Sequence, residues 1–292
     1  MDSQEKTLHW NKEKGSIHLV GPKSEQRLFL MRKGFMDSFF DEILNVEGKD
    51  ALSMTIRKIL EKAGAPVAEA TKPTVDTLNR FKDDCVLPLS FGPGELPAMF
   101  TQTEGTRDFV AFGSVVYLLE MAMILNIFKE VSAEILTPRG ARAIIRTVGK
   151  RAGMAVGDSA RANYSWNELD AATASLDQMT KFIFPLMGYG NPSVICAKGP
   201  DGNYLMFYRC HNTFESDGVS SPEPVCTVFA SFLEGITESI MLALTGQSAE
   251  CREVKCAAAG DAYCAFAVKV KAKGSPALDW AALKEEWRVL DT

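Results

Sequence analysis

Histidine is scarce in this sequence, and the motifs of several large enzyme classes are missing. The 292 residues include only three histidines, His9, His18 and His211, so a histidine-based catalytic site has very few candidates. The sequence contains no Gly-x-Ser-x-Gly elbow, no His-Glu-x-x-His helix, no Walker A loop and no dinucleotide-binding glycine fingerprint. These absences argue against serine-hydrolase, zinc-peptidase and nucleotide-dependent chemistry.

The sequence also lacks an excess of basic residues and a long uninterrupted apolar run. Lys and Arg number 32 against 37 Asp and Glu, and a net charge of −5 offers no basic stripe for nucleic-acid phosphates. The most apolar stretch, 115–128, contains Glu120 and Asn126. It is shorter than the roughly 20 residues that span a bilayer. The first residues are polar and acidic, unlike a secretory signal. We therefore expect a cytoplasmic protein without a membrane span and without direct contact with nucleic acid.

An apolar fraction of 46% indicates a chain that buries a large core. Apolar spacing and turn residues predict an α+β fold, in which an antiparallel sheet of two hairpins packs on helices. The expected strands are 16–20, 27–31, 193–197, 204–208, 250–257 and 263–270. The expected helices are 35–44, 51–63, 75–84, 113–136, 138–155, 169–179, 223–244 and 276–290.

We divide the chain into an N-terminal region, 1–112, a main domain, 113–272, and a C-terminal helix, 273–292. Similar helix pairs end at 63–64 and at 152–153. The N-terminal region is therefore either a degenerate helical repeat or a cap over the main domain. The apolar helix expected after residue 113 suits either the seam of a homodimer or the inside of the core.

Seven cysteines, an odd number, favour reduced thiols or metal ligands over a disulfide framework. Glu253, Cys256 and Cys264 lie close together in the last hairpin. Residues three apart on a regular strand face opposite sides, so Glu253 and Cys256 converge only if the strand bends or bulges near its end. A tetrahedral zinc site needs a fourth ligand, and without one these cysteines are buried reduced thiols. The candidates for the fourth ligand are, in order, Cys226, Cys210 and Cys251.

The same residues resemble the vinyl-4-reductase (4VR) domain family, over about 113–272. The segments that carry the resemblance are Pro224-Val225-Cys226, Phe232-Leu233-Glu234-Gly235-Ile236, Gly149-Lys150-Arg151-Ala152-Gly153 and the run from Glu253 to Phe266. The family includes archaeal hydrocarbon-binding proteins, bacteriochlorophyll 4-vinyl reductase-like proteins and the sensor domains of phenol-responsive activators. The domain also looks like subunits of vesicle-tethering complexes. The resemblance implies a zinc ion held by Cys226, Glu253, Cys256 and Cys264. Four protein ligands leave no open position, so this zinc would be structural.

The resemblance further implies an apolar pocket for a small molecule, between the helices and the sheet. Aromatic side chains would form its wall, and a few polar groups would orient the ligand. The residues expected to bind the ligand are Trp166, Phe207, Tyr208, His211, Phe214, Phe229 and Phe232.

The function expected from the resemblance is that of a stand-alone sensor, carrier or accessory protein, with no catalytic residue assigned. Its ligand would be apolar, aromatic or tetrapyrrole-like. One alternative is a reductase, or a reductase subunit, that acts on a vinyl group of a tetrapyrrole. The sequence has no nicotinamide, flavin or iron–sulfur motif to deliver the electrons. A second alternative is a dimeric assembly protein.

Overall fold

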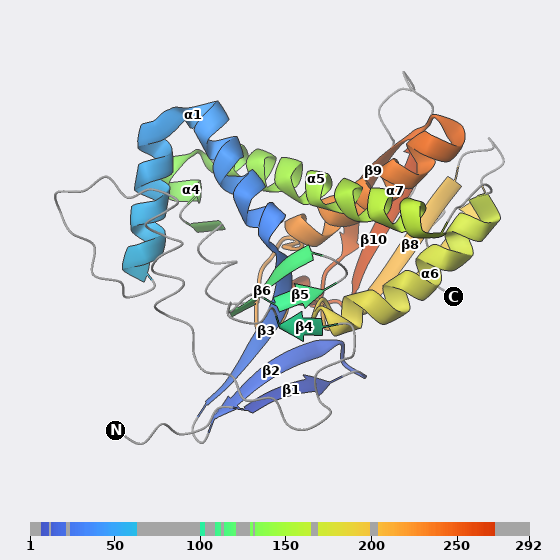
Figure 1. Ribbon diagram of the computed structural model, residues 1–292, viewed down its shortest axis with the longest axis horizontal. Coiled ribbons are helices and arrows are strands. Elements are labelled where there is room, and N and C mark those ends of the chain that lie inside the picture. The colour runs from blue at the N-terminus through green and yellow to red at the C-terminus, as the bar shows by residue number, and fades with distance from the viewer. Residues whose placement is uncertain are drawn as a thin grey trace.

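The computed structural model describes residues 7–11, 13–21, 24–62, 100–102, 109–111, 114–120, 129–130, 132–164, 169–198 and 204–271. They form two antiparallel sheets and a set of helices that lie between and beside the sheets (Figure 1). This arrangement confirms the predicted α+β class.

The C-terminal sheet has four antiparallel strands in the order β7-β8-β10-β9. These strands are β7 (Asn191–Lys198), β8 (Tyr204–His211), β9 (Ser248–Lys255) and β10 (Cys264–Lys271). Both predicted hairpins are confirmed, and the pairing of β8 with β10 joins them into one sheet. Because side chains alternate along a strand, Met206, Tyr208 and Cys210 of β8 belong to the main core, whereas Leu205 and Phe207 belong to a small cluster on the opposite face.

Helix α7 (Thr227–Thr245) packs against α5 (Pro138–Tyr164) along a stripe of glycines. A Cβ atom on Gly153 would lie 2.0 Å from the Phe232 carbonyl oxygen, and one on Gly235 would lie 2.0 Å from the Lys150 carbonyl oxygen. Glycine costs a helix roughly 0.5–1 kcal/mol relative to alanine, so its presence here reflects the close approach of the two backbones.

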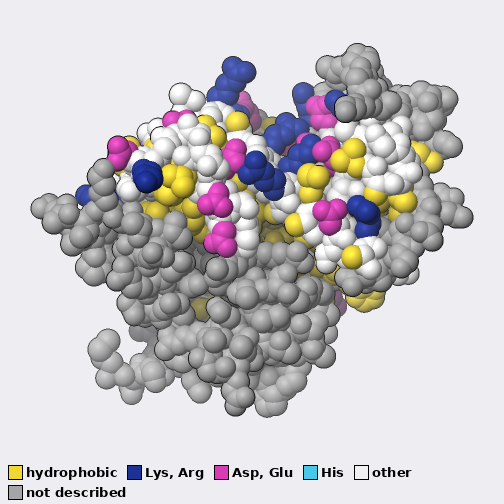
Figure 2. Space-filling model, turned by 45° about the horizontal axis from the view of Figure 1, so that its top comes forward, with side chains coloured by type: hydrophobic (Ala, Val, Ile, Leu, Met, Phe, Trp, Pro, Cys, Tyr) yellow, Lys and Arg dark blue, Asp and Glu magenta, His cyan; other side chains and the backbone are white. Residues whose placement is uncertain are grey.

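Charged side chains tie the same two helices together at their edges. Arg146 Nη2 lies 2.8 Å from Glu234 Oε2, and Lys150 Nζ lies 2.8 Å from Glu238 Oε2. Figure 2 shows basic and acidic side chains close together on this side of the molecule, so neither sign dominates it.

The N-terminal sheet has six strands in the order β1-β2-β3-β6-β5-β4. Its strands are β1 (Thr7–Asn11), β2 (Ser16–Gly21), β3 (Ser24–Arg32), β4 (Phe100–Gln102), β5 (Phe109–Ala111) and β6 (Ser114–Glu120). The Leu30 N–H donates to the Met187 carbonyl oxygen at 2.8 Å, directly after α6 (Leu169–Leu186). This bond brings β3 next to the turn that leads into the C-terminal sheet.

Two predicted helical segments differ in the structure. The helix expected over 113–136 is wrong, because 114–120 form strand β6, which pairs with β3 and β5, and the short helix α4 (Ser132–Ile135) follows later. A short apolar run fits a buried strand as well as a helix, and only the free edge of β3 decided between them. The helices expected over 35–44 and 51–63 form one helix, α1 (Lys33–Lys62), which kinks at Gly48, where φ is +85°. The helices expected over 75–84 and 276–290 lie outside the described residues.

Helix α7 is long and apolar enough to cross a bilayer, with a mean hydropathy of 1.4. Its apolar residues are buried between α5 and the C-terminal sheet, as in a core helix. The length and composition of α7 are therefore explained by its position in the core.

Candidate metal centre and apolar pocket

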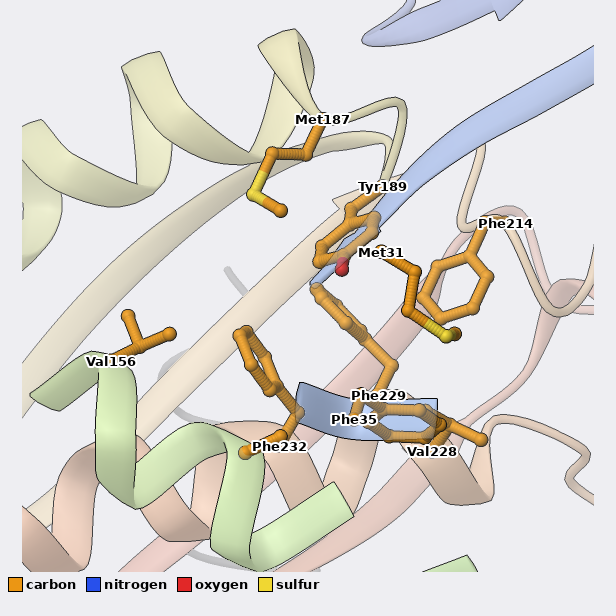
Figure 3. A pocket seen from close by; sticks show the side chains of 10 residues that line it. Met31, Phe35, Val156, Met187, Tyr189, Phe214, Val228, Phe229 and Phe232 are labelled. Carbon is orange, nitrogen blue, oxygen red and sulfur yellow. The ribbon is translucent and has the colours of Figure 1, made fainter. Parts of the chain in front are cut away.

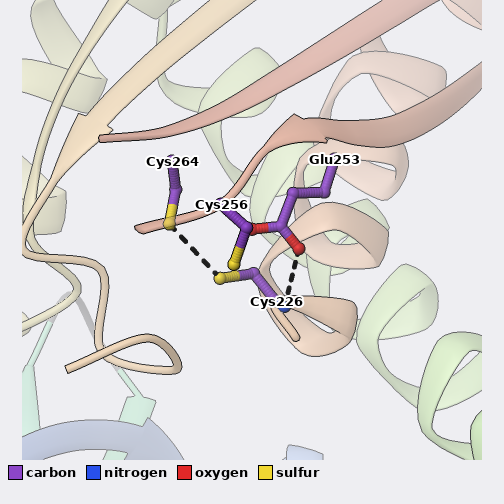
Figure 4. Close-up of side chains that lie close together, drawn as sticks. All are labelled: Cys226, Glu253, Cys256 and Cys264. Atoms are coloured by element: carbon purple, nitrogen blue, oxygen red, sulfur yellow. Dashed lines mark hydrogen bonds between the residues drawn. The ribbon is translucent and has the colours of Figure 1, made fainter. Parts of the chain in front are cut away.

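Four side chains that can bind a metal meet where β9 ends, β10 begins and α7 begins (Figure 4). One ligand atom from each of Cys226, Glu253, Cys256 and Cys264 lies within 4.8 Å of the other three. The Sγ atoms of Cys226 and Cys264 are 3.7 Å apart, too far for a disulfide bond. With Zn–S bonds of about 2.3 Å, the edge of a tetrahedral site measures roughly 3.8 Å. The group therefore has the dimensions of a tetrahedral metal centre.

The end of β9 is irregular, and this irregularity brings Glu253 and Cys256 together. The pairing of β9 with β10 shifts register between Ala265 and Phe266, which lie opposite Lys255 and Glu253. One residue of β9 is thus extra, as the predicted bulge requires. A 3₁₀ turn over Ala257–Ala259 then reverses the chain toward Cys264.

Hydrogen bonds hold the ligand atoms in this arrangement. The backbone N–H of Cys226 donates to Glu253 Oε2 at 2.8 Å, and the backbone N–H of Ala257 donates to the Cys264 sulfur at 3.3 Å. The backbone N–H of Cys256 donates to Asp261 Oδ2 at 2.8 Å, which closes the turn. The side chains therefore converge without help from a bound ion.

The electrostatics of the group favour thiolates. Hydrogen bonds from the Cys226 thiol are the main cause that lowers the pKa of Cys256 to about 6 and that of Cys264 to about 6. Burial is the main cause that raises the pKa of Cys226 well above its ordinary value, and it also raises the pKa of Glu253 to about 8. Without a cation, the group keeps two ligands protonated and two ionised at neutral pH.

A metal cation would satisfy what this group lacks. Among the described residues, Glu253 Oε1 is a buried oxygen without a hydrogen-bond partner. Three sulfurs and one carboxylate oxygen in tetrahedral proximity form a donor set that suits Zn²⁺. The substitutes considered for Cys226, namely Cys210 and Cys251, are buried elsewhere in the sheet and are not members of the group. The residues present thus fit a metal ion with four protein ligands.

An apolar cavity of about 30 Å³ lies beside the start of α7 (Figure 3). Its wall combines segments that are far apart in the sequence: β3, α1, α5, the turn after α6, the loop after β8, and α7. The lining residues are Met31, Phe35, Ala152, Val156, Met187, Tyr189, Phe214, Val228, Phe229 and Phe232. Only Tyr189 carries a polar side-chain atom, so the cavity offers one hydroxyl group and otherwise apolar surface.

The structure brings three of the predicted ligand-binding residues, Phe214, Phe229 and Phe232, to this cavity. Tyr208 faces α7 instead, with its hydroxyl 3.4 Å from Thr237 Oγ1. Phe207 lies on the opposite face of the sheet, as alternation along β8 requires. His211 is exposed, with its ring 5.5 Å from that of Tyr263. Trp166 lies outside the described residues.

Sequence reasoning missed the other lining residues. Met31 and Phe35 are separated from α7 by almost 200 residues, and nothing local distinguishes them from ordinary core residues. Tyr189 lies between two glycines with positive φ, Gly188 (+77°) and Gly190 (+105°). That Gly-Tyr-Gly pattern was the one local signal that could have marked a side chain held in a fixed position by a tight turn.

Comparison with known proteins gives one family match. Residues 206–270 match the model of the vinyl-4-reductase (4VR) domain, the family predicted from the sequence. The matched segment contains all four residues of the metal-binding group and three aromatic residues of the cavity. No curated protein sequence matches the chain.

Several solved structures share part of the fold at low sequence identity. The phenol-responsive sensory domain of the transcription activator PoxR, solved with phenol, is 19% identical with a TM-score of 0.49, and the alignment covers 59% of this chain and 85% of that chain. A trafficking protein particle complex subunit 3 from Naegleria fowleri, covalently bound to palmitic acid, is 16% identical with a TM-score of 0.37, and covers 52% and 95%. An H-NOX protein is 12% identical with a TM-score of 0.42, and covers 85% and 100%.

Proposed function

We propose that the 4VR domain over residues 206–270, together with the segments that enclose its cavity, binds a small, neutral, apolar molecule. In this proposal the chain is a sensor, carrier or accessory protein, and Cys226, Glu253, Cys256 and Cys264 hold a structural Zn²⁺. The observation that carries the proposal is the cavity itself, whose wall is aromatic and aliphatic and which adjoins the metal-binding group.

The size and polarity of the cavity limit the class of ligand. A cavity needs roughly 10–15 Å³ to hold one water molecule. The about 30 Å³ present here therefore holds two or three non-hydrogen atoms before side chains move. A ring-sized molecule fits if the flexible side chains of Met31 and Met187 change rotamer. No lining residue carries a charge, so an ionised ligand would lose its hydration without compensation. A single-ring compound with at most one hydroxyl group is favoured, and a tetrapyrrole with its propionate groups is too large and too polar.

The metal would have a structural role. Bound Zn²⁺ supplies four strong bonds that join the beginning of α7 to both strands of the last hairpin. Cys226 precedes the turn of α7 that carries Val228 and Phe229, so the position of these cavity residues depends on the metal-binding group. Binding also releases the thiol protons, because a thiol ligates as the thiolate.

Elemental mass spectrometry of the untagged protein tests the metal. We expect about one zinc per chain in the wild type, and loss of zinc with a lower melting temperature in Cys256→Ser and Cys264→Ser. Cys196→Ser is the matched control, because Cys196 is half-buried on β7 and lies outside the group. A well-folded wild type that contains no zinc and takes up none would refute the metal site.

Calorimetric titration with toluene, phenol and benzoate tests the ligand class. We expect the two neutral compounds to bind and benzoate to bind at least ten times more weakly. Ala152→Leu fills the cavity and should abolish binding of the neutral compounds, while Ala143→Leu, the same change on the exposed face of α5, should not. Binding of neither neutral compound, or unchanged binding in Ala152→Leu, would refute the proposal.

A further inference from the structure

One short loop contacts both the cavity and the metal-binding group. The loop over 212–217 follows β8, and three of its side chains, those of Thr213, Glu215 and Ser216, are polar and buried. Asn212 at its beginning has a positive φ of 55°, which fixes the direction in which the loop leaves the strand. The loop is thus a defined structure with several buried polar contacts.

The metal side of the loop is Ser216. Its hydroxyl oxygen lies 3.3 Å from the Cys264 sulfur and 2.8 Å from Thr213 Oγ1. A shift of this hydroxyl changes the hydrogen bonding, and hence the position, of one candidate metal ligand.

The helix side of the loop is Glu215, which is 1% exposed. Its carboxylate accepts hydrogen bonds from the backbone N–H groups of Val228 at 3.2 Å and Phe229 at 2.7 Å. Lys129 Nζ lies 3.2 Å from the same carboxylate. Glu215 therefore holds the first turn of α7, which directly follows the candidate ligand Cys226 and contributes two residues to the cavity wall.

The cavity side of the loop is Phe214. Its ring stacks on Phe29 with a centroid distance of 5.1 Å and meets Phe229 edge-on at 5.9 Å. Figure 3 shows Phe214 and Phe229 on the same side of the cavity. A molecule that enters the cavity must contact Phe214, whose two neighbours in the chain include Glu215.

The outer end of the loop is also fixed. Arg27 of β3 contacts the Asp217 carboxylate with Nη1 at 2.7 Å and donates through Nη2 to the Asn212 carbonyl oxygen at 2.5 Å. Both ends of the loop are therefore held by one side chain from the N-terminal sheet, and displacements of Phe214 are transmitted to the residues between these ends.

We propose that the loop over 212–217 couples the cavity to the metal-binding group, so that an apolar molecule in the cavity raises the affinity for the metal and the metal raises the affinity for the molecule. This inference rests on the proposed function, because it requires that both sites are occupied. Whichever ligand binds first orders the loop, so the second ligand binds without that entropic cost. Linkage then requires that the two affinities change by the same factor.

Co²⁺ titration tests the coupling, because Co²⁺ bound to thiolates absorbs visible and near-ultraviolet light. The metal-free full chain is titrated with Co²⁺ against a competing chelator, with and without saturating phenol. We expect phenol to raise the Co²⁺ affinity by about fivefold or more, the lower end of typical couplings between sites. Calorimetry with phenol should show the same factor between the Co²⁺-loaded and metal-free protein.

Ser216→Ala removes the contact with Cys264 but leaves every candidate ligand and cavity residue in place. We expect both sites to bind in this variant, with the coupling reduced to less than about twofold. Ser193→Ala, at an exposed position on β7, is the matched control and should retain the full coupling. Equal Co²⁺ affinity with and without bound phenol in the wild type, or full coupling in Ser216→Ala, would overturn the inference and leave the proposed function standing. Failure of phenol and toluene to bind at all would instead overturn the proposed function.

Discussion

Replacement of Gly153 by alanine should destabilise the protein strongly, although it adds only one methyl group to a helix. Gly153 lies on α5 where this helix meets α7. The added Cβ would lie 2.0 Å from the Phe232 carbonyl oxygen and 2.9 Å from the Ile236 nitrogen. Both are backbone atoms, so no side-chain rotation can relieve the contacts.

The magnitude follows from the separation that these contacts force. An ordinary Cβ contact is 3.4 Å or longer, so the helices must part by more than about 1 Å at this point. Neighbouring glycines make the same close approach, since a Cβ on Gly149 would lie 2.1 Å from Ser231 Oγ. Overpacking of a filled core costs about 1–3 kcal/mol and sometimes more. Wider separation along the helix pair adds to this, and the better helix propensity of alanine returns about 1 kcal/mol. We expect a net loss of about 2–3 kcal/mol in the free energy of unfolding.

Thermal denaturation followed by circular dichroism measures this loss. At about 2–4 °C per kcal/mol, the melting temperature should fall by about 4–12 °C. Gly34→Ala in α1 is the control, since no atom lies within 4 Å of its added Cβ, and its stability should be unchanged or slightly higher. A melting temperature of Gly153→Ala equal to that of Gly34→Ala would refute the close helix packing.

Two further predictions concern charged groups. Arg27→Gln should cost about 1–3 kcal/mol, because the buried guanidinium holds both ends of the 212–217 loop, whereas Asp217→Asn should cost less than about 1 kcal/mol, because this carboxylate is half-exposed; urea denaturation of both variants checks the order, and equal losses would contradict it. In the metal-free protein, burial raises the pKa of Glu253 from 4.5 to about 8, so the folded state retains a proton that the unfolded state loses. Stability should therefore fall as the pH rises from about 4.5 to 6, before Cys256 and Cys264 ionise near their pKa of about 6, and Glu253→Gln should remove this fall. An unchanged slope in urea denaturation series over this pH range would contradict the assignment.

Local patterns in the sequence predicted much of the C-terminal half. The Gly-Asp turn between two apolar runs indicated the β9–β10 hairpin, and the proline-led apolar segment indicated α7, both of which are present. The need for a bulge followed from the odd spacing of Glu253 and Cys256 on one strand. These features depend on neighbours within about twenty residues, and local pattern is informative at that range.

The errors lie where the outcome depends on a distant partner. The run over 114–120 forms a strand because β3 offers it an unpaired edge, a contact across about 90 residues. The cavity wall likewise takes Met31 and Phe35 from the N-terminal region, which the sequence described only as a repeat or a cap. Apolar residues of this kind look the same in sequence whether they fill a core or line a cavity.

The sequence by itself determined the α+β class, the two hairpins and the four residues that can bind a metal, because turn chemistry, side-chain periodicity and thiol and carboxylate donors are properties of the residues themselves. Only the tertiary structure decided that the sulfur atoms of Cys226 and Cys264 lie 3.7 Å apart and that an apolar cavity opens beside them. Distances between segments far apart in the chain are set by packing, above all by the glycine contact of α5 with α7, and packing is a joint property of all the segments that meet there.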